Sequence, residues 1–267
     1  MTHNCLNCDG TLQAEFKFCA QCGQRTHLHR LSLHEVLHEA IHYFTHADKG
    51  FFILVKALFT KSGTVANEYI AGKRKSYFPP LNFFLLVATI YVLLIGFTAQ
   101  KSVGDVMKAH PELRYIPDAA KREQVRQIYE RKDKAQMFMN KYSNIVAMTA
   151  VPLICFIYWL FYIRGKYNYT EHLVACFYMA GFTYLVYAVI AVPVSLLSGN
   201  KLRSGSVELA IAFMLFQMVY NAFFYYRFIN NRSKAGAWKA VGVSLCAVLL
   251  WFSLSGFLVG LYIRTGF

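Results

Sequence analysis

Charged residues are scarce in this chain of 267 residues, and acidic residues are scarcer than basic ones. Only 16% of the residues are charged, whereas soluble domains average about 25%. The chain has 14 Asp and Glu against 28 Lys and Arg, which gives a formal net charge of +14. These shortages, with 56% hydrophobic residues, argue against a secreted disulfide scaffold, a disordered tail and a typical cytosolic enzyme. They favour a membrane protein whose basic segments face water.

Recognisable catalytic motifs are also missing. The sequence contains no GxSxG, HExxH, P-loop or GxGxxG pattern, and no pair of carboxylates recurs within an apolar run. Ionisable residues inside membrane spans usually mark enzymes and transporters, and here such residues are almost absent. Gln217 and Asn221, four residues apart, are the candidate intramembrane polar pair, and we expect them to hydrogen-bond between helices. The sequence therefore favours a protein that is not an enzyme.

The apolar residues gather in long runs. A helix needs about 20 apolar residues to cross a bilayer, so we interpret these runs as transmembrane helices rather than buried helices of a soluble protein. The runs are Asn82–Ala99, Asn144–Ile163, Leu173–Leu197, Val207–Tyr226 and Ala240–Ile263. The predicted fold class is an all-α polytopic membrane protein with about five transmembrane helices, an N-terminal zinc ribbon and an amphipathic interfacial helix.

The flanking residues predict the orientation of these helices. The first thirty residues lack the apolar stretch of a signal peptide, and the basic residues 73–75 precede the first run. We therefore expect a cytoplasmic N-terminus, an external C-terminus and an external loop over residues 100–143, whose charges are of both signs. In this loop, Asp118 is the expected N-cap of a helix that reaches Tyr142 and continues into the second run.

Two CxxC pairs near the N-terminus predict a metal site. Cys5 and Cys8 precede Gly10, while Cys19 and Cys22 precede Gly23. Two such knuckles supply four thiolates, which suits tetrahedral Zn²⁺ with no open position for catalysis. A segment of about 25 residues cannot bury enough surface to fold alone, so structural zinc would supply its folding energy. A disulfide pair or a redox CxxC is the alternative, but a cytoplasmic location and the missing thioredoxin-like setting disfavour them.

Histidines recur every four residues after this segment. We expect a helix that opens at Ser32 with a Ser32/Glu35 capping box, polar on one face and apolar on the other. The histidines on the polar face are His34, His38, His42 and His46. In one interpretation these histidines form a second metal site or a pH sensor. In the interpretation that we favour, they form a stripe that faces water or lipid headgroups.

A basic, aromatic segment precedes the first apolar run. Residues 48–59 form a short apolar stretch that suits a helix lying in the membrane interface. The candidate residues for headgroup or partner contact follow it and are Lys73, Arg74, Lys75 and Tyr77. Basic residues beside aromatics attract anionic headgroups. Plain positive-inside anchoring is the alternative, and it explains the charge but not the glycines and prolines of this segment.

These pieces divide the chain into a zinc ribbon (1–26), an amphipathic and interfacial region (32–77) and a transmembrane bundle (78–267). Together they resemble a bacterial family of zinc-ribbon integral membrane proteins of unknown function, over residues 1 to about 95. The resemblance rests on the four cysteines and on the segments 46–51, 58–63, 68–69, 72–75 and 77–80. It implies residence in a bacterial inner membrane and a bound metal, but no activity. The five runs also resemble Yip1-type membrane proteins in topology alone.

Three functions follow as hypotheses. The leading one is a non-enzymatic membrane protein whose zinc ribbon and basic segment recruit a protein partner or contact lipid headgroups. Nucleic acid is a less suitable partner, because the ribbon's basic residues, Lys17 and Arg25, are balanced by Asp9 and Glu15. The second hypothesis is a small-molecule or lipid transporter or scramblase, working as a homo-oligomer. The third is an enzyme acting on a lipid-linked substrate through Glu171, His172 or the histidine stripe.

Overall fold

A computed structural model describes residues 3–13, 15–42, 50–98, 110–197, 207–230 and 233–266. The described chain is mostly helical, as predicted, with a two-stranded antiparallel sheet near the N-terminus. The strands are β1 (His3–Asn4) and β2 (Thr11–Leu12). The helices are α1 (Leu33–His42), α2 (Gly50–Thr60), α3 (Thr64–Ile70), α4 (Pro80–Thr98), the 3-10 helix η2 (Pro111–Tyr115), α6 (Ala119–Lys141), α7 (Ser143–Phe161), α8 (Tyr169–Leu197), α9 (Val207–Ile229) and α10 (Lys234–Thr265).

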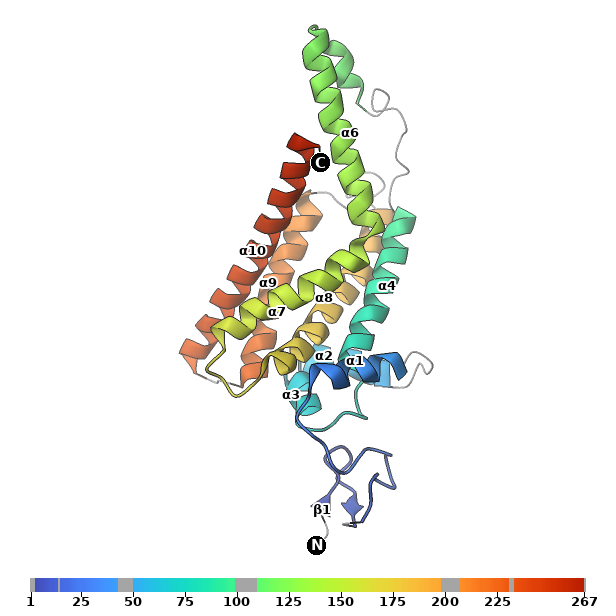
Figure 1. Cartoon of the computed structure of the whole chain (residues 1–267), viewed down its shortest axis with the longest axis vertical. Coiled ribbons are helices and arrows are strands. Elements are labelled where there is room, and N and C mark those ends of the chain that lie inside the picture. The colour runs from blue at the N-terminus through green and yellow to red at the C-terminus, as the bar shows by residue number, and fades with distance from the viewer. Residues whose placement is uncertain are drawn as a thin grey trace.

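The body of the molecule is a bundle of α4, α7, α8, α9 and α10 (Figure 1). These helices coincide with the five apolar runs, so the prediction of helices there is confirmed. Helix α8 lies at the centre and packs against α4, α7 and α9. Residues 171–179 of α8 are all buried, because neighbouring segments cover this part of the helix on every side.

Two helical segments are long and apolar enough to cross a membrane: Tyr169–Ile190 of α8 and Lys234–Thr265, which is α10. They differ in how much protein covers them. In the most apolar part, 61% of the α8 segment is buried, but only 22% of α10. Helix α10 exposes large apolar side chains such as Leu250, Phe257 and Leu258. The central helix is thus shielded by protein, whereas α10 presents an apolar surface outward.

The long helix expected from Asp118 into the second apolar run is divided in two. The side chain of Asp118 accepts hydrogen bonds from the backbone N–H groups of Ala120 and Lys121, so the predicted N-cap is confirmed. However, α6 ends at Lys141 and α7 begins at Ser143. Between them, Tyr142 has a φ of −108° and a ψ of 19°, outside the helical range. The chain therefore bends at Tyr142, and α6 projects away from the bundle while α7 packs within it (Figure 1).

The N-terminal segment and α6 lie at opposite ends of the molecule (Figure 1). At the N-terminal end, α1, α2 and α3 lie against the bundle, and Asn67 of α3 donates a hydrogen bond to the Arg227 carbonyl at the end of α9. At the opposite end, Arg131 of α6 donates hydrogen bonds to the last carbonyls of α10, including that of Arg264. Helix α2 buries Leu54 and exposes Phe52, so one of its sides packs on the protein, and its place in a membrane interface stays a prediction.

Gly63 allows α3 to approach α9 closely. A Cβ atom at this position would lie 1.9 Å from the Phe224 carbonyl oxygen and 2.7 Å from the Phe228 nitrogen. Both atoms belong to the backbone of α9, so they cannot move aside as the end of a flexible side chain would.

We expect Gly63→Ala to destabilise the protein by about 1–3 kcal/mol, because the added methyl group forces α3 and α9 apart. Thermal unfolding of the purified protein measures this effect. Gly242→Ala is the matched control, since a Cβ there meets no atom within 4 Å among the described residues, and alanine favours its helix. Equal melting temperatures for the two variants would contradict the close approach.

Candidate metal centre and basic hinge

The two CxxC segments fold into knuckles with the same backbone pattern. In the first knuckle, Cys5 N–H donates to the Gly10 carbonyl and Asp9 N–H donates back to the Cys5 carbonyl, at 2.8 and 2.9 Å. In the second, Cys19 N–H donates to the Gln24 carbonyl and Gly23 N–H to the Cys19 carbonyl, at 2.7 and 2.8 Å. The fifth residue of each knuckle has a positive φ, 58° at Asp9 and 69° at Gly23. Glycine meets this requirement in the second knuckle, but Asp9 meets it in the first, because aspartate tolerates the left-handed region.

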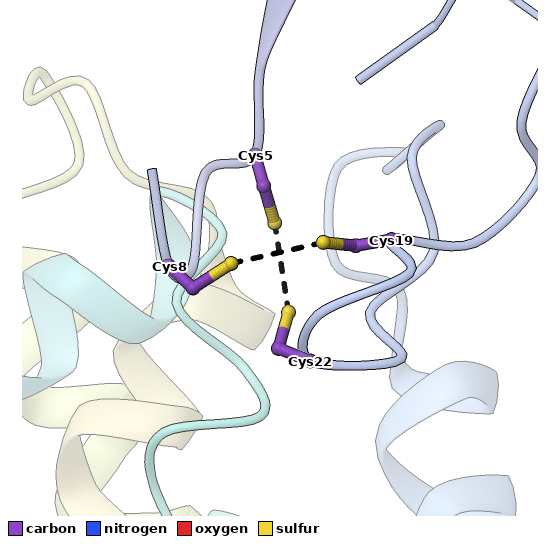
Figure 2. A group of neighbouring side chains, drawn as sticks. All are labelled: Cys5, Cys8, Cys19 and Cys22. Carbon is purple, nitrogen blue, oxygen red and sulfur yellow. Dashed lines mark hydrogen bonds between the residues drawn. The ribbon is translucent and has the colours of Figure 1, made fainter. Parts of the chain in front are cut away.

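The four sulfur atoms point toward a common centre (Figure 2). All of them lie within 4.8 Å of one another, and the Cys5–Cys22 and Cys8–Cys19 pairs are 3.6 and 3.7 Å apart. Tetrahedral coordination with Zn–S bonds of about 2.3 Å places sulfurs about 3.8 Å apart. Every cysteine is a free thiol, so the disulfide alternative is not what this structure adopts. The predicted cluster of Cys5, Cys8, Cys19 and Cys22 is therefore formed, and its donor set could hold a metal ion.

The electrostatics of the four thiols also favour binding of a cation at the cluster. Backbone N–H groups of Cys22 and Gln21 point at the Cys19 sulfur and lower the pKa of this thiol to about 7. The Gly10 amide favours the Cys8 thiolate in the same way, but burial and the three neighbouring thiols outweigh it and raise the pKa of Cys8 to about 12. Four thiolates this close repel one another, and a bound divalent cation would offset that repulsion and join the two knuckles.

The ribbon, residues 3–26, docks onto the chain just before α4. We call residues 71–79 the hinge. The side-chain oxygen of Asn7, inside the first knuckle, accepts hydrogen bonds from the Ser76 N–H and hydroxyl at 2.9 and 2.8 Å. The side-chain oxygen of Gln24, which follows the second knuckle, accepts from the backbone N–H groups of Arg74 and Lys75 at 3.2 and 3.3 Å. The ribbon therefore contributes two amide side chains that fix the hinge, one from within the first knuckle and one from just after the second.

Gly72 completes this contact. It has a φ of +121°, which side chains rarely adopt, and a Cβ there would lie 2.9 Å from Leu6 Cδ1 and 3.1 Å from Leu28 Cδ1. Glycine is thus required both by the turn and by the side chains packed over it. The sequence shows Asn7, Gln24 and Gly72 but gives no sign that they meet, because they are far apart along the chain.

The four hinge residues predicted for headgroup or partner contact differ in exposure. Lys75 is exposed, and Lys73 and Arg74 are half-buried. Tyr77 is buried, and its hydroxyl donates a hydrogen bond to Glu68 on α3. Burial opposes the ionisation of Glu68, but hydrogen bonds from Tyr77 and Lys61 outweigh burial and hold the pKa of Glu68 below its usual value. Tyr77 therefore fixes the hinge to α3 from inside, and the surface of the hinge is basic.

An ion pair fixes the segment between the ribbon and α1. The sequence did not predict this pair. Arg30, between the ribbon and α1, donates hydrogen bonds to both carboxylate oxygens of Glu171 at 2.9 and 2.8 Å, and also to the Lys166 carbonyl. Glu171 is 4% exposed. Asn168 and Glu171 also exchange backbone-to-side-chain hydrogen bonds, which form a capping box at the start of α8. A carboxylate beside an apolar run signals that a cation is near, but nothing in the sequence selects Arg30 among the basic residues.

The other predicted positions are only partly described. Helix α1 starts with the expected capping box, in which Ser32 N–H donates to Glu35 and Glu35 N–H donates to the Ser32 hydroxyl. His34 is exposed on this helix. The side chains of His38 and His42, and all of His46, lie outside the described residues, so their role stays a prediction. Gln217 is half-buried on α9 and Asn221 is buried four residues later.

Comparison with known proteins agrees with part of this picture. Residues 48–92 match a family model described as "Protein of unknown function (DUF3667)". The match contains α2, α3, the hinge and the first part of α4, and lies within the stretch on which the resemblance was based. No curated protein and no solved structure matches the chain. The matched segment is thus similar to an uncharacterised family, and the cysteine cluster that could hold a metal lies on its N-terminal side.

Proposed function

We propose that this chain is a non-enzymatic, multi-pass protein of a bacterial inner membrane. In this proposal a zinc ribbon and the basic hinge form one cytoplasmic surface that recruits a protein partner or contacts lipid headgroups. The observation that carries the proposal is the docking of the ribbon onto the hinge through Asn7 and Gln24. This contact places the cysteine cluster, which could hold a metal ion, beside basic residues at the entrance of an apolar helix.

The outer surface of the bundle supports membrane residence. Helix α10 is long and apolar, yet 78% of its most apolar part is not buried (100% minus the 22% that is). Leu153 and Phe156 on α7 and Leu215 and Val219 on α9 are likewise exposed. Exposure of this apolar surface to water would cost free energy, whereas in a membrane the lipid chains would cover it. This supports the interpretation of all five bundle helices as spans.

The distribution of basic residues supports the orientation. Basic residues gather at helix ends and in loops on the ribbon side of the bundle. They are those of the hinge together with Arg164, Lys166, Arg227 and Lys239. Such an excess is typical of cytoplasmic loops. Helix α6 lies at the opposite end (Figure 1) and carries seven Lys and Arg against three Asp and Glu. This excess opposes the orientation, but long loops count for less in the positive-inside rule than short ones do.

The ribbon surface supports a protein partner. Phe16 and Phe18 are 40% and 55% exposed. Exposed aromatic side chains are enriched at protein–protein interfaces. The ribbon itself carries little net charge, so it lacks the basic surface that nucleic acid requires.

Labelling tests the membrane topology. Gln124→Cys on α6 and Lys166→Cys between α7 and α8 place one new thiol at each end of the molecule. In intact cells stripped of any outer envelope, a membrane-impermeant maleimide should label the first variant, and it should label the second only after lysis. The unsubstituted chain measures labelling of the native cysteines. Equal labelling of both variants before lysis would refute the proposed topology.

Photocrosslinking tests recruitment. A photoreactive phenylalanine analogue at Phe16 should form a discrete protein adduct in native membranes. The same analogue at Tyr115, an 85% exposed residue near α6, is the control and should not form that adduct. An adduct of twice the chain mass would make the partner a second copy. The recruitment proposal fails if Phe16 gives no adduct or if Tyr115 gives the same one.

A further inference from the structure

A cleft lies between the ribbon, the segment that links it to α1, and the hinge. Its volume is about 610 Å³, which lies within the range of small-molecule sites. The residues that carry basic groups into it are Arg25, His27, His29, His34, Arg74 and Lys75. They come from all the surrounding segments, so the cleft exists only when the ribbon is folded and docked.

The cleft carries a net positive charge, with three Lys and Arg against one Glu among the residues that line it. Among the residues that line it, Glu35 supplies the carboxylate, and this group accepts hydrogen bonds from the Ser32 N–H and hydroxyl at 3.0 and 3.3 Å. The negative charge is thus held at the start of α1, where it caps the helix. Arg25, Arg74 and Lys75 remain as fixed positive charges. A concave surface of one sign concentrates ligands of the opposite sign.

Arg74 is held in place with a free donor. Its backbone N–H binds Gln24 of the ribbon, and its Nη2 donates to the His29 carbonyl at 2.9 Å. The Nε atom is buried and has no hydrogen-bond partner in the described part of the chain. A buried donor without a partner costs free energy, and a small movement of the side chain that brought Nε to a ligand oxygen in the cleft would remove this cost. Guanidinium groups match the oxygens of phosphate particularly well.

The floor of the cleft is apolar. Tyr69 is 1% exposed, and Leu28 and Phe18 also line the wall. The cleft therefore offers cationic groups for an anionic head and apolar groups for the organic body attached to it. This combination fits a phosphate ester better than a bare inorganic anion.

We propose that this cleft binds the phosphate group of a phosphate ester, with Arg74 and Arg25 as its principal contacts. A phospholipid headgroup and a soluble phosphate ester share this chemistry. The inference deepens the proposed function, because it names what the ribbon and hinge together recognise.

Binding is tested on the full-length, metal-loaded protein in an uncharged detergent. Calorimetric titration with a short-chain phosphatidic acid should show saturable binding to one site per chain. Titration with glycerol 3-phosphate, the same head without acyl chains, distinguishes the two sources. Tighter binding of the lipid by tenfold or more identifies a headgroup site, and equal or tighter binding of glycerol 3-phosphate identifies a soluble ligand. Absence of saturable binding of both probes overturns the proposal.

Variants test the location of the site. Arg74→Gln should weaken binding at least tenfold. Because Arg74 also holds His29, the exposed Arg25→Gln provides a second variant that should weaken binding with the fold intact. Arg114→Gln removes the same charge from the opposite end of the molecule and should bind as the unsubstituted protein does. A loss in Arg114→Gln equal to that in Arg74→Gln would overturn the assignment.

The metal content and the Phe16 adduct are measured on the same variants. If both persist while the protein binds neither probe, the phosphate site is wrong but recruitment stands. If the adduct is absent while saturable binding of a probe remains, recruitment fails and the phosphate site stands.

Discussion

The double variant Cys5→Ser/Cys8→Ser will lose its metal almost completely, from about one ion per chain to less than about 0.1. Serine hydroxyls do not replace thiolates as zinc ligands, and two cysteines cannot hold the ion in a tetrahedral site. Elemental analysis of the purified protein measures both the amount and the identity of the metal, and we expect zinc.

Loss of the metal will also unfold the ribbon. Its buried apolar residues are few, essentially Leu12 with Cys5 and Cys19, whereas binding of structural zinc to such segments is worth about 10–16 kcal/mol. The ribbon then releases the hinge, because Asn7 and Gln24 no longer keep their positions. Hydrogen exchange of the backbone amides at Arg74, Lys75 and Ser76 should therefore become faster in the variant.

The matched control for this experiment is Cys246→Ser. Cys246 is half-buried in α10, far from the cluster in sequence and in the fold. This variant should keep about one ion per chain and the slow exchange of the hinge amides. Metal retained in the double variant, or lost in the control, would contradict the ligand assignment. Iron in place of zinc would leave the four ligands correct and make the choice of metal wrong.

Glu171→Ala will lower the melting temperature of the purified protein by about 5 °C or more. The change removes the acceptor of two hydrogen bonds from Arg30 and half of the capping box of α8. The lost contacts connect the segment before α1 to the start of the central helix, so the loss affects the core of the fold rather than one surface.

Glu123→Ala is the control for this variant. Glu123 also pairs with an arginine, Arg126, but it lies on the projecting helix α6 and is exposed to solvent. Exposed pairs contribute little, so this variant should melt within about 2 °C of the unsubstituted protein.

Because Arg30 loses its partner in Glu171→Ala, adding Arg30→Ala to that variant should lower the melting temperature little further. Equal effects of the Glu171 and Glu123 variants would show that the Arg30–Glu171 pair is not important for stability.

Much of the local structure could be predicted from single segments of sequence. The apolar runs predicted the bundle helices, because a run of about twenty apolar residues leaves few alternatives to a helix. Asp118 and the Ser32/Glu35 pair marked helix starts, because N-caps depend only on neighbouring residues. The break at Tyr142 was missed, because a helical pattern does not show where a chain must turn to pack.

The spacing of Cys5, Cys8, Cys19 and Cys22 was enough to predict the cysteine cluster that could hold a metal, since this spacing is a local property of two tight turns. The sequence by itself also determined the positions of the bundle helices. Only the tertiary structure decided that Arg30 pairs with Glu171, that Asn7 and Gln24 hold the hinge, and that basic groups from separate segments meet in one cleft. Each of these contacts joins residues that are distant in sequence. Pairwise attraction between charges or amides does not identify partners until packing has brought the segments together.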